Sequence, residues 1–218
     1  EVSVLSFTDG KTVVPMVSSM DHKRALDGDK GLNTGGMGTV APNPFYTETV
    51  AKRCMDEIFL PTINAMNAEG RTFKGCLYFG LMLTKDGPKV IEYNCRFGDP
   101  ETQVVLPLLE SDLLTVMQAV TKTDLLTVMK AVCDGKLKET PVEFEQKHAC
   151  CVVMASKGYP TEYEKGFEIT FDGDVFENVF VAGATAKDGK LYTNGGRVLG
   201  VTEIGDTLES AVKKAYAS

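Results

Sequence analysis

Apolar runs separated by turn signals dominate the first hundred residues. Residues 2–7 and 12–17 are two such runs that flank an Asp-Gly pair, and residues 75–83 and 88–94 flank a second Asp-Gly pair. Asp-Gly between two apolar runs is typical of a tight turn between antiparallel strands. The pattern therefore predicts two β-hairpins.

Between the hairpins, the pattern changes to that of a helix. Thr47 is suited to cap a helix that runs over residues 50–70, ends at a glycine and is kinked by Pro61. Residues 101–109 begin a second apolar helical stretch. Residues 18–44 are rich in Gly, Asp, Asn and Pro and show neither period. They predict a long loop, and such loops are usually functional or disordered.

A nine-residue segment occurs twice. DLLTVMQAV at 112–120 recurs as DLLTVMKAV at 124–132 with one difference. Two copies are too few for a solenoid. An offset of about 3.3 helical turns would also place the copies on different faces of one straight helix. We interpret the repeat as a local duplication, in which one copy packs and the other lengthens a helix or bulges out.

The remaining third of the chain is rich in short strands. A polar stretch at 139–147 precedes apolar runs divided by Gly and Pro, and an amphipathic helix capped by Thr207 closes the chain. We therefore expect a domain at 1–134, a connector at 135–147 and a β-rich domain at 148–218. The predicted fold class is α+β.

Composition removes several classes of function. The 218 residues are 43% hydrophobic and 24% charged with a net charge of −7, as in an ordinary globular protein, and no basic run exceeds residues 22–24. A nucleic-acid footprint, a membrane helix and a secretory signal are not supported. Six cysteines without a CxxC pair, and only two histidines, argue against zinc and favour reduced thiols in a cytoplasm. Because the chain starts at Glu1 inside a strand-like run, we expect it to be a piece of a longer protein.

The segment 91–101, IEYNCRFGDPE, concentrates oxygen ligands. Glu92 and Asn94 lie two apart on a predicted strand, so their side chains leave the same face, while Cys95 faces the core on the other side. A carboxylate beside an amide oxygen suits Mg²⁺, which typically takes one or two protein ligands together with phosphate oxygens. The alternative is a solvated strand end in which Arg96 forms an ordinary salt bridge.

The residues after this pair suit an anion. The Arg96 guanidinium can bind two phosphate or carboxylate oxygens at once, and Gly98 allows close backbone approach. Asp99 is placed to cap the next helix with Pro100 at its first position, so free N–H groups would face the same anion.

A second candidate segment lies in the predicted loop. Asp21, Lys23 and Arg24 precede Asn33-Thr34-Gly35-Gly36-Met37-Gly38. Glycines can adopt positive φ without strain, so the sequence predicts successive bare N–H groups that form a nest for an anion, with Lys23 or Arg24 adding charge. A flexible surface loop is the alternative.

Taken together, DHKRALDGDKGLNTGGMG and KVIEYNCRFGDPETQ resemble the glycinamide ribonucleotide synthetases, ATP-grasp ligases of purine synthesis. The strand before the second motif and NGGRVLGVT near the end are also similar to that family. The resemblance implies the second half of an ATP-grasp domain, an antiparallel sheet with flanking helices, followed by a small, mainly β C-terminal domain.

The resemblance also implies a reaction. ATP phosphorylates glycine, and the amine of 5-phosphoribosylamine attacks the glycyl phosphate, which gives glycinamide ribonucleotide, ADP and phosphate. It implies that Glu92 and Asn94 hold Mg²⁺ or Mn²⁺ and that Arg96 and Asp99 are catalytic. ATP contacts are implied for Glu1, Arg24 and Asn33. Substrate contacts are implied for Asp21, Lys23, Thr34, Gly35, Gly36, Gly38, Gly98 and Pro100.

The sequence departs from the family pattern in three respects. The front half of the enzyme and the stretch after the last helix are expected to be missing, and the DLLTVM segment is doubled. We therefore expect the chain alone to be inactive. Another ATP-grasp carboxylate–amine ligase and a non-catalytic binding module are the alternative functions. Glycine and 5-phosphoribosylamine are the expected partners, with neither nucleic acid nor membrane.

Overall fold

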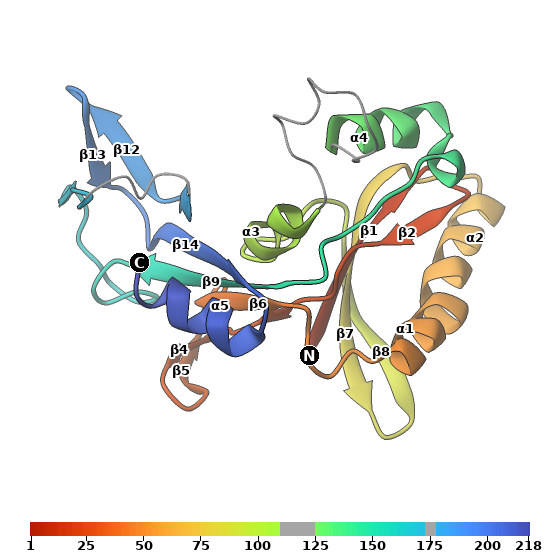
Figure 1. The fold of residues 1–218 in the computed structure, drawn as a ribbon, viewed down its shortest axis with the longest axis horizontal. Helices are drawn as coiled ribbons and strands as arrows, with labels where there is room; N and C mark the ends of the chain where they lie inside the picture. The colour runs from red at the N-terminus through yellow and green to blue at the C-terminus, as the bar shows by residue number, and fades with distance from the viewer. Residues whose placement is uncertain (110–124, 173–177) are drawn as a thin grey trace. The chain divides into compact units, whose positions relative to one another are not determined.

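The computed structural model describes residues 1–109, 125–172 and 178–218 (Figure 1). The chain forms two compact units that are discontinuous in sequence. The first comprises residues 1–20, 42–98 and 105–146, and the second comprises residues 21–41, 99–104 and 147–218. The second unit therefore takes two short segments from the stretch that the sequence assigned to the first domain. The predicted domain boundary at 135–147 stays a prediction. The two compact units do not test it, because each of them is made of three separate stretches of the chain.

The first unit contains both predicted hairpins. Strands β1 (Val2–Thr8) and β2 (Val13–Pro15) pair antiparallel, as do β7 (Gly75–Thr84) and β8 (Gly87–Asn94). Because β1 also pairs with β7, the four strands form one sheet in the order β2-β1-β7-β8. Long-range pairing thus joins two hairpins that are each local in sequence.

One face of this sheet is covered by the predicted helix. It runs through α1 (Glu48–Cys54), a π-helical turn (Met55–Phe59) and α2 (Leu60–Ala68). The Thr47 hydroxyl caps it by accepting from the N–H of Val50. Phe59 packs on Phe79 of β7 with ring centroids 4.2 Å apart, inside a core of buried apolar side chains. The π turn stands immediately before Pro61, where the sequence predicts a kink.

A shorter helical layer lies on the opposite face. Helix α4 (Leu125–Asp134) contacts β1 and β7 and buries Val128, Ala131 and Val132 (Figure 1). It contains most of the second copy of the repeated segment, whereas the first copy, 112–120, lies outside the described residues. The helical stretch predicted after Glu101 is present as α3 (Thr102–Val105) and a 3₁₀ turn (Leu106–Leu108). Another 3₁₀ turn (Leu137–Glu139) follows α4.

The second unit is built on a five-stranded sheet of order β11-β14-β9-β6-β3. Its two long central strands are β9 (His148–Ala155) and β14 (Arg197–Gly205), and α5 (Leu208–Ala215), capped by Thr207, packs against both. A smaller sheet has the order β10-β13-β12. The shorter strands of these two sheets are β3 (Met20–Asp21), β6 (Gly38–Ala41), β10 (Glu168–Ile169), β11 (Val179–Val181), β12 (Ala184–Lys187) and β13 (Lys190–Thr193).

The prediction of a long loop at 18–44 is wrong. This segment forms β3, β6 and a separate hairpin of β4 (Arg24–Leu26) and β5 (Lys30–Asn33). Its strands are two to four residues long, too short for a period to show in the sequence. Strand β6 pairs with β9, more than a hundred residues later. Its backbone hydrogen bonds therefore depend on a partner that is distant in sequence, and the local pattern does not reveal the strand. With these strands the α+β fold class, antiparallel sheets with few helices, is confirmed.

No helix within the described ranges is long and apolar enough to cross a membrane.

Asp9 secures the turn between β1 and β2. Its carboxylate accepts from the N–H groups of Lys11 and Thr12 at 2.9 and 2.8 Å, and from the N–H of Leu137 at 3.3 Å. Burial acts to raise the pKa of this carboxyl, but the N–H groups of Thr12, Lys11 and Leu137 together lower the pKa below its usual value. One side chain therefore links the first hairpin to the segment after α4.

We expect Asp9→Ala to lower the free energy of unfolding at pH 7 by about 1.5–3 kcal/mol, because backbone donors lose a charged acceptor. A lowered folded-state pKa means that the stabilisation is complete above the unfolded pKa, about 4, and is lost as pH falls through the folded value. The difference from wild type should therefore shrink at pH 3 in urea titrations. Asp86→Ala, in the exposed turn of the second hairpin, is the matched control. Equal losses in the two variants would contradict the prediction.

Candidate active site

The two candidate metal ligands lie on one face of β8. Glu92 pairs with Gly80 and Asn94 with Tyr78, two residues apart on both strands. Between them, Tyr93 pairs with Phe79 and meets its ring edge-on at 5.6 Å, on the face covered by α1 and α2. Glu92 is exposed and Asn94 is half-buried. The carboxylate and the amide thus share one face of β8, the face away from these helices.

A β-bulge decides this orientation. Leu81 pairs with Val90, whereas Gly80 pairs with Glu92, so Ile91 is an extra residue on β8. Without the bulge, Glu92 would lie opposite Phe79 and would point into the apolar core, because a one-residue slip exchanges the two faces of a strand. Gly80 leaves the necessary space, since a Cβ atom there would lie 2.9 Å from Cγ of Glu92.

Arg96 follows this pair and is exposed. Its Nη1 donates to the carbonyl oxygen of Phe97 at 2.8 Å. No carboxylate of the described residues pairs with Arg96, so the ordinary salt bridge considered from sequence is not formed in this part of the chain. Cys95, which the sequence placed in the core, is exposed. The strand ends at Asn94, and the side-chain alternation ends with it.

The glycine-rich segment does not offer the bare N–H groups that the sequence predicts. The N–H of Thr34 donates to the carbonyl of Lys23, that of Gly35 to the Tyr159 hydroxyl, that of Gly36 to the Thr34 hydroxyl, and that of Met37 to the carbonyl of His22. Each of these four donors has an acceptor inside the protein. The expected anion nest is therefore wrong for residues 34–37.

The glycines instead allow close packing. A Cβ atom on Gly36, whose φ is +115°, would lie 2.5 Å from Cδ of Pro100 and 2.7 Å from Oδ1 of Asp21. A Cβ on Gly35 would lie 3.0 Å from Cζ of Arg197, and one on Gly38 would lie 2.8 Å from the carbonyl oxygen of Cys151. These short approaches bring segments that are distant in sequence together within the second unit.

Asp99 does not cap the helix as expected. Helix α3 begins at Thr102 and has four residues, and Asp99 Oδ1 accepts from the Gln103 side chain at 2.8 Å. The other carboxylate oxygen accepts from Nη2 of Arg197 at 2.9 Å. Asp99 is therefore held by side chains, and the short helix presents no anion site at its start.

The candidate ATP contacts fall in two places. Arg24 and Asn33 pair directly across the β4–β5 hairpin, where the Arg24 guanidinium donates to the carbonyl of Gly31 at 2.8 Å. Glu1 is exposed, and its carbonyl accepts from the side-chain amide of Asn43 at 3.1 Å. Arg24 also lines a hollow of about 520 Å³ between the hairpin, β6, β9 and α5.

Within the second unit, the structure thus brings together five candidates: Asp21, Gly35, Gly36, Asp99 and Pro100. The first unit holds Glu1, Glu92, Asn94, Arg96 and Gly98. Among the described residues, no group of three His, Cys, Asp or Glu side chains could hold a metal ion. Burial raises the pKa of Cys150 to about 11, so this thiol stays protonated at neutral pH.

Comparison with known proteins places these residues in a family. Residues 1–102 match the ATP-grasp (A) domain model of phosphoribosylglycinamide synthetase, and residues 149–218 match its C domain model. The chain belongs to the phosphoribosylglycinamide synthetase family.

Individual relatives agree with this assignment. A phosphoribosylamine–glycine ligase of Caldanaerobacter subterraneus subsp. tengcongensis is 48% identical over 99% of this chain and 49% of its own length. A trifunctional purine biosynthetic protein adenosine-3 of Gallus gallus is 50% identical over 99% of this chain and 21% of its own length. The crystal structure of a Thermotoga maritima phosphoribosylamine–glycine ligase has a TM-score of 0.83 and 38% identity over 99% of this chain and 51% of that chain. The chain spans about half the length of the ligases it matches.

Sequence reasoning missed Arg197 and Tyr159 in the C domain. Both contact Gly35, which is more than 120 residues earlier. NGGR carries only the similarity to the family, and Tyr159 lies between a Gly and a Pro that divide two apolar runs, so neither segment predicts a contact with Gly35. Their partners are distant in sequence, so the local pattern could not reveal the contacts.

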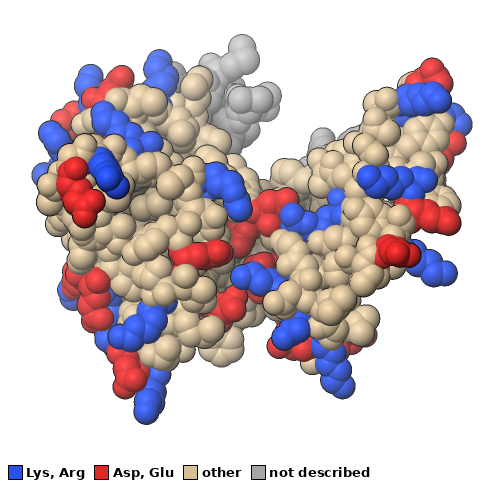
Figure 2. All heavy atoms as spheres, turned by 180° about the vertical axis from the view of Figure 1, so that it is seen from behind, with Lys and Arg blue, Asp and Glu red and all other residues tan. Residues whose placement is uncertain are grey.

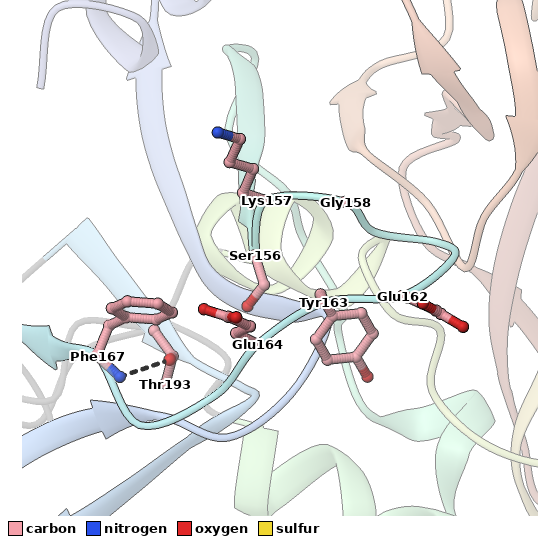
Figure 3. A pocket seen from close by; sticks show the side chains of 8 residues that line it. All are labelled: Ser156, Lys157, Gly158, Glu162, Tyr163, Glu164, Phe167 and Thr193. Atoms are coloured by element: carbon pink, nitrogen blue, oxygen red, sulfur yellow. Dashed lines mark hydrogen bonds between the residues drawn. The ribbon is translucent and has the colours of Figure 1, made fainter.

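The segment on both sides of Tyr159 borders a hollow of about 950 Å³ in the C domain (Figure 3). In the close-up, Glu164 points toward Ser156 and Thr193, while Lys157 points away from them. The N–H of Phe167 donates to the Thr193 hydroxyl at 3.1 Å. The lining residues are Ser156, Lys157, Gly158, Glu162, Tyr163, Glu164, Phe167 and Thr193.

Gly36→Ala should destabilise the protein more than Gly166→Ala. Both glycines have positive φ, +115° and +90°, so both substitutions incur a backbone cost of about 1–3 kcal/mol. A Cβ on Gly166 meets nothing within 4 Å, whereas one on Gly36 overlaps Pro100 and Asp21. Overpacking should add about 1–3 kcal/mol to the Gly36 variant. Denaturant titration of both variants measures the difference in the free energy of unfolding. An equal decrease in both variants would show that the close packing around Gly36 does not limit the side chain at this position.

Proposed function

We propose that this chain forms the carboxy-terminal ATP-grasp and C-domain portion of an ATP-dependent ligase. The enzyme joins glycine to 5-phosphoribosylamine and yields glycinamide ribonucleotide, ADP and phosphate through glycyl phosphate, a step of purine biosynthesis in the cytoplasm. The observation that carries the proposal is that Glu92 and Asn94 project from the same face of β8 in a chain of this family. The similar ligases, named for the same reaction, support it.

The donor set of this pair suits Mg²⁺ or Mn²⁺. Glu92 supplies a carboxylate and Asn94 an amide oxygen, and hard divalent cations prefer such oxygen ligands. A bound ion would offset the negative charge of the ATP phosphates. Phosphoryl transfer depends mainly on positioning and charge stabilisation, so no nucleophilic side chain is needed.

The remaining residues are assigned by their chemistry. Arg96 offers a guanidinium that no described carboxylate neutralises, which suits the developing acyl phosphate. Asp99 is the second proposed catalytic residue. Glu1, Arg24 and Asn33 are the proposed ATP contacts. The proposed substrate contacts are Asp21, Lys23, Thr34, Gly35, Gly36, Gly38, Gly98 and Pro100.

Joining this chain to the part of the Caldanaerobacter relative that lies outside the match gives a completed protein in which to test the proposal. Glycine-dependent release of ADP in the presence of 5-phosphoribosylamine is the expected activity. Replacing the acceptor with other amines separates this ligase from another carboxylate–amine ligase. Neither activity nor a thermal shift with ATP and Mg²⁺ would favour a non-catalytic module, because ligand at 100 times Kd should stabilise by about 2.7 kcal/mol.

In the completed protein, Glu92→Gln should lower kcat by about a hundredfold or more, because a charged ligand of a catalytic ion is lost. The substitution preserves shape, so Tm should change little. Steady-state kinetics over a range of Mg²⁺ concentrations measure the effect, with the exposed Glu143→Gln as the matched control. Unchanged activity would exclude a metal role for Glu92.

Gly80→Ala should weaken the dependence on Mg²⁺ without removing any ligand atom. The added methyl group would displace Cγ of Glu92, which lies 2.9 Å from its position, and so move the carboxylate. We expect the Mg²⁺ concentration for half-maximal activity to rise about tenfold, as when the support of a metal ligand is lost. An unaltered Mg²⁺ titration would show that Gly80 does not position Glu92.

A further inference from the structure

Two segments of the second unit that are distant in sequence meet at the guanidinium of Arg197. Its Nη1 donates to the carbonyl oxygens of Gly35 and Asp99 at 2.7 and 3.2 Å, and its Nη2 donates to Asp99 Oδ2 at 2.9 Å. The planar fork of arginine allows one side chain to bind several oxygens at fixed angles. Arg197 therefore holds the glycine-rich segment and the Asp99–Pro100 turn in one arrangement, which we call the Arg197 clamp.

The backbone of Arg197 is itself fixed. It pairs with Ala155 at the end of β9, and its carbonyl accepts from the N–H of Gly183 at 2.8 Å. A Cβ on Gly183 would lie 2.7 Å from Cα of Gly195, so these two backbones are also in close contact. The side chain thus extends from a rigid base, as a residue that orients other groups requires.

Tyr159 fastens the same segment from another direction. Its hydroxyl accepts from the N–H of Gly35 at 3.2 Å, and its own N–H donates to the carbonyl of Ser156 at 3.0 Å. Its ring packs against Gly196, the neighbour of Arg197. Both polar groups of the Gly35 backbone are therefore held by C-domain side chains, the N–H by Tyr159 and the carbonyl by Arg197.

The clamp differs from an open anion site. The Arg197 charge is paired with Asp99, whereas the described carboxylates leave Arg96 unpaired. The side chain of Arg197 is 23% exposed and that of Asp99 is 52% exposed, so the carboxylate is the more accessible half. An accessible carboxylate suits an ammonium group and not a second anion.

We propose that Arg197, together with Tyr159, is a positioning residue that shapes the site for the amino-acid substrate and presents Asp99 to its ammonium group. The inference rests on the proposed ligase function. It assigns the Gly35 and Asp99 segments to the amino acid. The nucleotide is left to other residues, since Arg24 and Asn33 form a hairpin pair of their own.

Hydrogen exchange in this chain tests the clamp without any assay of activity. Arg197→Gln should speed exchange of the Gly35 and Gly36 N–H groups by about tenfold or more. The reason is that loss of the hydrogen bonds from the guanidinium to Gly35 and Asp99 makes local unfolding of this segment more frequent. Exchange in α5 should stay unchanged. Lys190→Gln, which removes the exposed ion pair with Glu168 in the same unit, is the matched control. Tyr159→Phe keeps the ring and removes only the hydroxyl, and serves if Arg197→Gln does not fold.

Kinetics in the completed protein test the substrate assignment. Arg197→Gln should raise KM for glycine by about tenfold or more, while KM for ATP should change less than about threefold. Arg197→Lys should recover only part of the loss, because an ammonium cannot reproduce the fork. A merely structural role would lower the amount of folded enzyme without separating the two KM values.

The outcomes are distinct. Faster exchange at Gly35 together with a selective rise in the KM for glycine supports the proposal. Unchanged exchange overturns the clamp, and faster exchange with unchanged or equally raised KM values overturns the assignment to the amino acid. If the wild-type completed protein lacks ligase activity, the proposed function is overturned and the kinetic role of Arg197 with it. If the wild-type protein is active and the KM values of Arg197→Gln equal those of wild type, only this inference is overturned.

Discussion

The antiparallel register of β7 and β8 is the constraint on which the candidate metal site depends. A strand presents alternate residues to opposite faces, so the register alone decides which side chains of β8 face α1 and α2 and which face the other side of the sheet. The bulge at Ile91 sends Val90 and Tyr93 to the helix-covered face, and Glu92 and Asn94 to the other. The apolar face stabilises the register, because slipping it by one residue would bury a carboxylate against Phe79.

Glycine has a different use in each unit. Opposite Glu92, Gly80 makes room for a side chain across a strand pair. In the second unit, Gly35 and Gly36 let backbone approach Arg197 and Pro100, while their N–H groups are already bonded within the protein. A glycine-rich segment is commonly interpreted as an anion cradle, but here its hydrogen bonds and short contacts indicate a packing role.

Charges of both signs occur on the face of the protein that Figure 2 shows. The face in Figure 2 carries Lys and Arg interspersed with Asp and Glu. Against this background, the state of individual arginines matters more than net charge. Arg197 is paired with Asp99 and donates to the backbone carbonyls of Gly35 and Asp99, whereas Arg96 meets no described carboxylate.

The sequence by itself determined the elements whose signals are local. Both Asp-Gly hairpins, the helices capped by Thr47 and Thr207, and the shared face of Glu92 and Asn94 follow from spacing, because turns, caps and strand alternation are set by neighbouring residues. Tertiary structure alone decided the strands within 18–44, the occupied N–H groups of the glycine-rich segment, and the contacts of Arg197 and Tyr159 with Gly35. Each depends on a partner that is distant in sequence, and a hydrogen bond to such a partner leaves no periodic trace in either segment.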